Sequence, residues 1–216
     1  MKNLKIIIGI IVIIVIIFLL AKGGYKKSED KAESANTTQS GILEIKSDDW
    51  VTGNPNAKVT LVEYLDFECE ACAAYYPITT QLKEEYKDNL RFVVRYFPLP
   101  GHANSVTAAK AVEAAGRQGK FWEMYSALYE NQKEWGEQKV ANQEQFEKYA
   151  VAVGLDIEKW KIDLKDPALE DRIQRSYKEA VKLGLQGTPS FFLNGKKIES
   201  PKGYAPFKAL IEDAMK

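Results

Sequence analysis

The segment that carries both cysteines of the chain limits the possible folds most. Residues 59–65, VTLVEYL, are apolar on both alternating faces, which is typical of a central β-strand. The next segment shows helical spacing, at Cys72, Tyr75, Thr79, Leu82 and Tyr86. Residues 91–97, RFVVRYF, form a second apolar run. This order predicts a parallel βαβ unit with Cys69 at the junction of strand and helix.

The remainder of the chain predicts a helical insertion followed by a hairpin. Four helices are expected, over residues 104–116 and 121–130, around Phe146, Tyr149, Ala150 and Val153, and from Asp166 to near Gly184. Residues 189–200 then form a hairpin with Asn-Gly at its turn, and residues 204–216 a closing helix. We therefore expect an α/β domain with the order β-α-β, an insertion over about residues 103–184, and β-β-α.

The spacing of the two cysteines favours redox chemistry. The sulfur of Cys69 would meet the N-terminus of a helix, where free N–H groups and the helix dipole stabilise a thiolate. Cys72 follows one turn later on the same face, so it can form a disulfide with Cys69 or resolve a mixed disulfide on it. Two inert buried cysteines remain an alternative.

Metal and haem sites are disfavoured by the residue inventory. A structural zinc site needs about four nitrogen or sulfur ligands, and the chain has two cysteines and one histidine, His102. A c-type haem site needs a histidine directly after the second cysteine, but residue 73 is alanine. We expect neither a metal nor another cofactor. Equal numbers of basic and acidic residues, 30 each, also give no indication of nucleic-acid binding.

The N-terminal region has the composition of a membrane anchor and a tether. Residues 6–21 are uncharged and apolar, longer than a usual signal-peptide core and slightly short for a membrane span. Small residues suited to signal-peptidase cleavage are missing, so we expect an uncleaved anchor over residues 1–22, with a transmembrane helix at about 5–21. A cleaved signal peptide is the alternative. Residues 23–42 are polar and predict a flexible tether, and residues 43–216 the folded domain.

Three segments resemble the DsbA-like thiol:disulfide oxidoreductases, which are thioredoxin folds with a helical insertion. They are VTLVEYLDFECEAC, RYFPLPGHANSVTAAKAVEAA and LGLQGTPSFFLNGKKI, in this order. The resemblance covers roughly residues 47–216, and the overall layout is similar to the membrane-anchored bacterial branch. It implies that Cys69 is the solvent-facing nucleophile, that Cys72 is the resolving cysteine, and that Thr188-Pro189 is a cis-proline dipeptide whose backbone pairs with substrate. An ordinary trans proline at the start of a strand is the alternative for Pro189.

The resemblance also implies a buried, proton-handling carboxylate at Glu63. This residue shares a predicted strand face with Leu61 and Leu65, where an acid is unfavourable unless it has a purpose. A carboxylate with a raised pKa there could relay the proton of Cys72. The alternative is a solvated acid on a poorly covered face of the strand.

Other conspicuous side chains near the cysteines carry weaker signals. We expect His102 to cap or pack at the start of the insertion, and Tyr75 and Tyr76 to pack in the core and groove rather than to take part in chemistry. Between the cysteines the chain has Glu70-Ala71, where many relatives carry a proline-led dipeptide such as Pro-His. Glu70, together with Glu68, should disfavour the thiolate and make the disulfide less oxidising than that of DsbA.

Compartment and partners follow from the resemblance and from the chemistry. Protein oxidation belongs outside the cytosol, so we expect a monomer anchored in a bacterial cytoplasmic membrane with an extracytoplasmic domain. It would oxidise reduced or unfolded exported proteins and be reoxidised by an integral membrane, quinone-linked thiol oxidoreductase. A reductase in the same compartment, or a peptide-binding or chaperone module without redox turnover, are the alternatives.

Overall fold

The computed structural model describes residues 41–136, 138–139 and 143–216. The chain divides into two compact units, Met1–Glu44 and Ile45–Lys216. Only residues 41–44 of the first unit are described, and residues 41–43 are helical. The predicted anchor over residues 1–22, and all but the end of the predicted tether, therefore lie outside the described residues. Within the described ranges, no helix is both long and apolar enough to cross a membrane.

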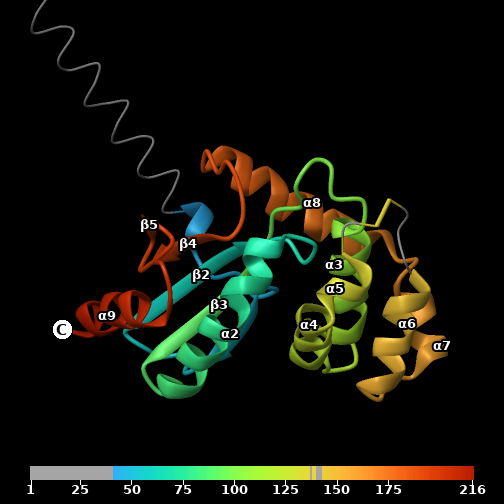
Figure 1. Cartoon of the computed structure of the whole chain (residues 1–216), viewed down its shortest axis with the longest axis horizontal. Coiled ribbons are helices and arrows are strands. Elements are labelled where there is room, and N and C mark those ends of the chain that lie inside the picture. The colour runs from blue at the N-terminus through green and yellow to red at the C-terminus, as the bar shows by residue number, and fades with distance from the viewer. Residues whose placement is uncertain (1–40, 137, 140–142) are drawn as a thin grey trace, which may run out of the picture. The chain divides into compact units, whose positions relative to one another are not determined.

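The described part of the second unit is built on a five-stranded sheet with the strand order β1-β3-β2-β4-β5 (Figure 1). The strands are β1 (Trp50–Gly53), β2 (Val59–Leu65), β3 (Leu90–Tyr96), β4 (Ser190–Leu193) and β5 (Lys196–Ile198). Strands β2 and β3 pair in parallel, and the other neighbours pair antiparallel. The predicted parallel βαβ unit is thus confirmed, with the second strand one residue earlier than expected.

Two helices pack on one face of this sheet. Helix α2 (Glu70–Glu85) leads from β2 to β3, and α9 (Tyr204–Met215) closes the chain. The ring of Phe191 on β4 contacts Tyr75 of α2 at 5.4 Å and Phe207 of α9 at 5.0 Å between centroids. The two helices also contact each other. They therefore bury the same apolar side of the sheet, which holds the start of α2 at a fixed place beside β4.

The helical insertion lies between β3 and β4. Its helices are α3 (Ser105–Gly116), α4 (Phe121–Glu130), α5 (Gln132–Trp135), α6 (Gln143–Ala152), α7 (Ile157–Asp163) and α8 (Pro167–Lys182). In Figure 1, α3 to α7 form a group beside the sheet, and α8 leads the chain back to it. The four predicted helices are confirmed. The sequence analysis missed α5 and α7, because four and seven residues are too few to show helical periodicity.

The hairpin between β4 and β5 turns at Asn194-Gly195, as predicted. Both residues have positive φ, 47° and 78°, which the tight hairpin turn requires and which Asn-Gly tolerates best. Asn194 also joins the hairpin to β2. Its N–H donates to the carbonyl of Thr60, and its Oδ1 accepts from the Thr60 N–H, both at 2.8 Å. The turn therefore fixes the register of β4, the strand that follows Pro189.

Strand β1 was not predicted, since its four residues, three half-buried and one exposed, show no clear alternation. Its first residue joins the sheet to the insertion. The Trp50 ring stacks on Phe121 of α4 at 4.2 Å, and its Nε1 donates to Glu113 of α3 at 2.7 Å. Gly116, the last residue of α3, lies directly against this ring: an added Cβ would come within 2.3 Å of it. A glycine is thus required where α3 meets β1.

We expect Gly116→Ala to destabilise the fold, because the new methyl group and the Trp50 ring cannot occupy the same space. The overlap should outweigh the better helix propensity of alanine and lower the free energy of unfolding by about 1–3 kcal/mol. Urea unfolding followed by circular dichroism measures this loss. In a Trp50→Phe background the smaller ring should remove most of the penalty. An equal loss in both backgrounds would contradict the assigned contact.

Candidate active site

Cys69 is the residue directly before α2, as the sequence predicted. It has extended backbone angles, its N–H donates to the carbonyl of Asp66, and its own carbonyl accepts from Ala73 in the first turn. Buried Gln132 of α5 donates its side-chain amide to the carbonyls of Phe67 and Cys69, at 2.7 and 3.0 Å. The insertion thus holds the backbone of the strand-to-helix loop, so the sulfur stays at the N-terminus of α2.

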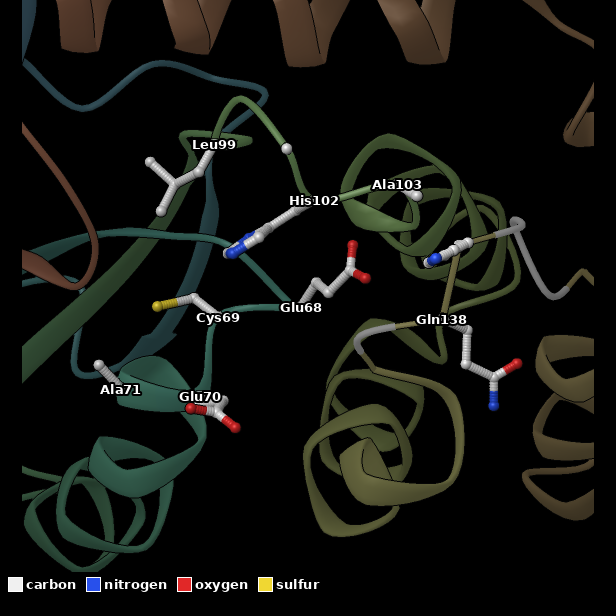
Figure 2. Close-up of a pocket in the computed structure, with 10 residues that line it drawn as sticks. Glu68, Cys69, Glu70, Ala71, Leu99, His102, Ala103 and Gln138 are labelled. Carbon is white, nitrogen blue, oxygen red and sulfur yellow. The ribbon is translucent and has the colours of Figure 1, made fainter.

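The two cysteines differ in access. Cys72 is 1% exposed and Cys69 7% exposed, so the outer cysteine is less open to solvent than expected. The sulfur of Cys69 is reached through a cavity of about 560 Å³. The cavity is lined by Glu68, Cys69, Glu70, Ala71, Leu99, Gly101, His102, Ala103, Gln138 and Lys139 (Figure 2). A thiol on a substrate can therefore approach Cys69 but not Cys72.

The same geometry separates the acidities of the two thiols. A hydrogen bond from the Cys72 thiol lowers the pKa of Cys69 to about 6, against the opposing effect of burial. The side chain of Thr188 and the N–H groups of Ala71 and Cys72 lower the Cys69 pKa further. Burial raises the pKa of Cys72 well above its usual range, and the hydrogen bond to Cys69 adds to this effect. At neutral pH, Cys69 is the thiolate and Cys72 keeps its proton.

The structure brings Thr188-Pro189 next to Cys69, 119 residues away in the chain. When Cys69 is protonated, its thiol donates to the carbonyl of Thr188, with a distance of 3.4 Å between sulfur and oxygen. The peptide bond between Thr188 and Pro189 is cis, as expected from the resemblance. Because β4 begins at Ser190, the sheet positions this dipeptide beside the sulfurs.

Glu63 lies beneath the cysteines on β2 and is 1% exposed, which contradicts the alternative of a solvated acid. Its Oε2 has no hydrogen-bond partner. Burial raises the pKa of Glu63 to about 8, partly offset by the charge of Lys83. The Lys83 ammonium itself lies 5.0–5.1 Å from the ring centroids of Phe92, Trp122 and Tyr125. Glu63 also raises the pKa of Cys72, so the two groups sense each other's charge.

Asp66 organises the site, and the sequence analysis did not identify it. The residue is 2% exposed. Its Oδ1 accepts from the Glu68 N–H at 2.9 Å and from the Ser105 hydroxyl at 2.6 Å. Its Oδ2 accepts from the Leu99 N–H at 2.8 Å and lies 2.7 Å from Nδ1 of His102. The only sequence signal was an acid directly after a buried strand, and its partners Leu99, His102 and Ser105 lie 33 to 39 residues away.

His102 and Glu68 lie in the segments that the sequence analysis expected, but their contacts differ: of the two roles expected for His102, capping is wrong, and packing before α3 is seen. His102 does not cap α3, which begins after Asn104, but faces the cavity with 32% of its side chain exposed. Glu68 is 3% exposed, and its carboxylate accepts from the backbone and side-chain N–H groups of Asn104, at 2.6 and 3.1 Å. In Figure 2 this carboxylate points away from the sulfur of Cys69. The carboxylate of Glu68 is therefore engaged by Asn104 and not directed at the sulfur.

Tyr75 and Tyr76 pack as predicted. The Tyr75 hydroxyl donates to the carbonyl of Pro201 at 2.9 Å, and the Tyr76 hydroxyl to Glu130 at 2.8 Å. The ring of Tyr76 stacks on Tyr129 at 5.4 Å. These contacts fasten α2 to α4 and to the segment before α9. Among the described residues, no group of three or more His, Cys, Asp or Glu side chains is placed to hold a metal ion.

Comparison with known proteins agrees with this geometry. A family model described as Thioredoxin matches residues 46–213. A thioredoxin-like oxidoreductase from Silicibacter pomeroyi is 31% identical, with 78% of this chain and 93% of that chain covered and a TM-score of 0.67. Oxidised BdbD from Bacillus subtilis is 23% identical over 76% and 91% of the chains, with a TM-score of 0.68. Wolbachia pipientis alpha-DsbA1 is 20% identical over 82% and 96%, with a TM-score of 0.74.

Curated relatives extend well beyond the matched region. The Na(+)/H(+) antiporter NhaA of Herminiimonas arsenicoxydans is 35% identical over 164 residues, which are 76% of this chain and 25% of the antiporter. The chain thus spans about a quarter of the length of such relatives. The match of the family model over most of the folded unit, and the reactive cysteine pair within it, lead to one conclusion. The chain belongs to the thioredoxin family and is a thiol-disulfide oxidoreductase with the fold of the DsbA-type enzymes.

Proposed function

We propose that this protein is an extracytoplasmic oxidase that donates the Cys69–Cys72 disulfide to exported proteins. The observation that carries the proposal is the contrast between an accessible Cys69 of low pKa and a buried Cys72 of high pKa. A thiolate that the site stabilises is a good leaving group, and it favours the reduced form of the pair. A disulfide with this property tends to be passed on to other thiols.

The reaction proceeds in two exchanges. A substrate thiolate attacks the sulfur of Cys69, the Cys69–Cys72 bond breaks, and Cys72 leaves and takes up a proton. A second substrate thiolate then attacks the substrate sulfur of the mixed disulfide, and Cys69 leaves as its thiolate. The substrate loses two electrons and forms a disulfide, and the cysteine pair gains them. The substrate protein binds with an extended segment along Thr188. The backbone of Thr188 can form hydrogen bonds with that segment beside the sulfurs.

Glu63 is proposed to handle the proton of Cys72. When Cys72 leaves as a thiolate in a buried place, a protonated Glu63 can supply its proton. When the pair is reoxidised, the Glu63 carboxylate can take that proton back. A pKa of about 8 keeps both forms accessible near neutral pH. A solvated carboxylate of ordinary pKa would be almost entirely ionised and could not supply the proton.

Location and partners rest on the sequence and on the family. The apolar run over residues 6–21 supports a single anchor in a bacterial cytoplasmic membrane, with the folded unit on the outer face. Quinone-linked oxidation by an integral membrane thiol oxidoreductase is the reoxidation route that the family implies. The relatives named as Na(+)/H(+) antiporters are membrane proteins by name, and their match to this chain lends support to a membrane-associated setting. Their antiporter activity is not proposed for this chain.

We expect Cys69 alone to be alkylated rapidly in the reduced native protein. The rate should rise with pH around the Cys69 pKa of about 6 and then level off, because only the thiolate reacts. Iodoacetamide labelling at pH 5 to 9, with peptide mass analysis, measures it. Cys69→Ser should leave the remaining thiol, Cys72, slow to react at all these pH values. Equal labelling of both cysteines would refute the division into nucleophile and resolving residue.

We expect the Cys69–Cys72 pair to be a stronger oxidant than thioredoxin, because the site stabilises the Cys69 thiolate. Equilibration with glutathione should give a potential above about −200 mV, between the values of roughly −270 mV for thioredoxin and −120 mV for DsbA. A Cys69→Ser variant provides the baseline without a disulfide. A potential near or below that of thioredoxin would favour the reductase hypothesis. In a separate experiment, unchanged activity of the Cys69→Ser variant in cells would favour a binding or chaperone role.

We expect Glu63→Gln to stabilise the reduced protein increasingly as pH rises. The pKa of Glu63 is raised from 4.5 to about 8 on folding, so the wild type loses stability as pH increases through this window, whereas glutamine does not ionise. The difference in unfolding free energy should grow between pH 4.5 and 8, approaching ~4 kcal/mol at the upper end. Urea unfolding at pH 5, 7 and 9 tests this, with Glu158→Gln at an exposed site as control. A difference independent of pH would exclude the buried titration.

A further inference from the structure

The cavity beside Cys69 contains one histidine that the proposed reaction does not use. Three elements bring charged side chains to its wall: Glu68 from the loop before α2, Glu70 from α2, and Lys139 from the insertion. His102 enters from the segment after β3. The Glu68 carboxylate is held by two hydrogen bonds from Asn104. Glu70 is exposed to water at the rim, where its field is screened.

Asp66 fixes the histidine in one orientation. Its Oδ2 lies 2.7 Å from Nδ1 of His102, and the same carboxylate is held by Ser105 and by the N–H groups of Glu68 and Leu99. Because Nδ1 is engaged with Asp66, protonation adds the proton at Nε2, the other ring nitrogen. Figure 2 shows the His102 side chain reaching from its loop toward the side of the cavity where the sulfur of Cys69 lies.

The surroundings of His102 favour its charged form. Partial burial lowers its pKa, but the hydrogen bond to Asp66 and the charges of Asp66, Glu68 and Cys69 outweigh burial and raise it. A cation on this wall therefore coexists with the Cys69 thiolate. The buried Asp66 carboxylate keeps the ring of His102 in this orientation. The charge on the cavity wall therefore changes only when His102 gains or loses a proton.

We propose that His102, held by Asp66 on the wall of the cavity, is the positioning residue whose positive charge stabilises the thiolate of Cys69. The inference rests on the proposed role of Cys69 as the nucleophile. It accounts for a departure of this chain from its family, since the dipeptide between the cysteines is Glu70-Ala71 and offers no cation of its own. The cation is supplied across the cavity, 33 residues further along the chain, instead of from within α2.

Thermodynamic linkage makes the proposal measurable from both sides. If the His102 cation increases the acidity of Cys69 by some factor, the Cys69 thiolate must increase the proton affinity of His102 by the same factor. Oxidation to the disulfide, or alkylation of Cys69, removes the thiolate charge. Proton binding by His102 should then weaken. A histidine that only packs against the loop would show no such dependence on the state of the sulfur.

The first test uses the fact that the chain has a single histidine. Its ring gives one set of NMR signals, so His102 can be titrated without assignment of the rest of the protein. We expect its proton affinity to be at least about threefold higher in the reduced protein than in the oxidised or Cys69-alkylated protein, because only the reduced protein carries the opposite charge of the thiolate on the same cavity. Equal titration curves in the three forms would overturn the proposal, and this comparison needs no variant.

The second test titrates Cys69 by thiolate absorbance in variants. His102→Gln should lower the acidity of Cys69 by the factor measured for His102, and slow its alkylation at pH 6 by about twofold or more while leaving the rate at pH 9 unchanged. His102→Lys retains a cation and should restore part of the effect. Ser105→Ala is the matched control, because it also removes a hydrogen bond to Asp66 but changes no charge. It should titrate like the wild type.

The outcomes separate this inference from the proposed function. A wild-type Cys69 that shows no thiolate below pH 8 would refute the function, whatever His102 does. A reactive Cys69 whose titration is the same with His102→Gln would refute the inference alone. An equally large shift in Ser105→Ala would assign the effect to the Asp66 hydrogen-bond network instead of the histidine charge, and would also overturn the inference.

Discussion

The Asp66 carboxylate, buried at the end of β2, joins the three chain segments that enclose the reactive sulfur. It accepts hydrogen bonds from the loop before α2, from the segment after β3 and from the first residue of α3. A buried carboxylate without these partners would be strongly unfavourable. The loops around Cys69 must therefore meet at Asp66 to supply its hydrogen bonds. This contact determines the shape of the cavity, the orientation of His102 and the position of the α2 N-terminus.

Three ionisable groups near Asp66, the two cysteines and Glu63, differ widely in pKa. Cys69 meets the N–H groups of the first turn of α2 and ionises easily, whereas Cys72, one turn deeper, is enclosed and holds its proton. Glu63, deeper still on β2, titrates between these limits. Burial alone would raise the pKa of all three groups. The helix terminus and the hydrogen bond between the sulfurs reverse its effect at Cys69 only, so that Cys69 alone is a thiolate at neutral pH.

The helical insertion contributes to the chemistry as well as to the core. Gln132 binds the backbone on both sides of the reactive loop, and Tyr125 borders the buried environment of Glu63 and Lys83. Trp50 and Glu113 tie the first helix of the insertion to the sheet edge. The thioredoxin-like sheet thus supplies the cysteines and the Thr188-Pro189 dipeptide, and the insertion immobilises them and walls the cavity through which a substrate reaches the sulfur.

Local pattern in the sequence determined the fold class, the parallel βαβ unit, the hairpin turn and the place of Cys69, because each depends on residues that are neighbours in the chain. It also indicated Glu63, since an acid on an apolar strand face is conspicuous. Short elements such as β1 and α7 were not predicted, because they have too few residues to show a periodic pattern. Asp66, the orientation of Glu68 and the position of His102 were decided only by tertiary structure. All but one of the hydrogen bonds that place their side chains join residues 33 to 39 positions apart, so the charge that each presents to Cys69 depends on how distant segments pack.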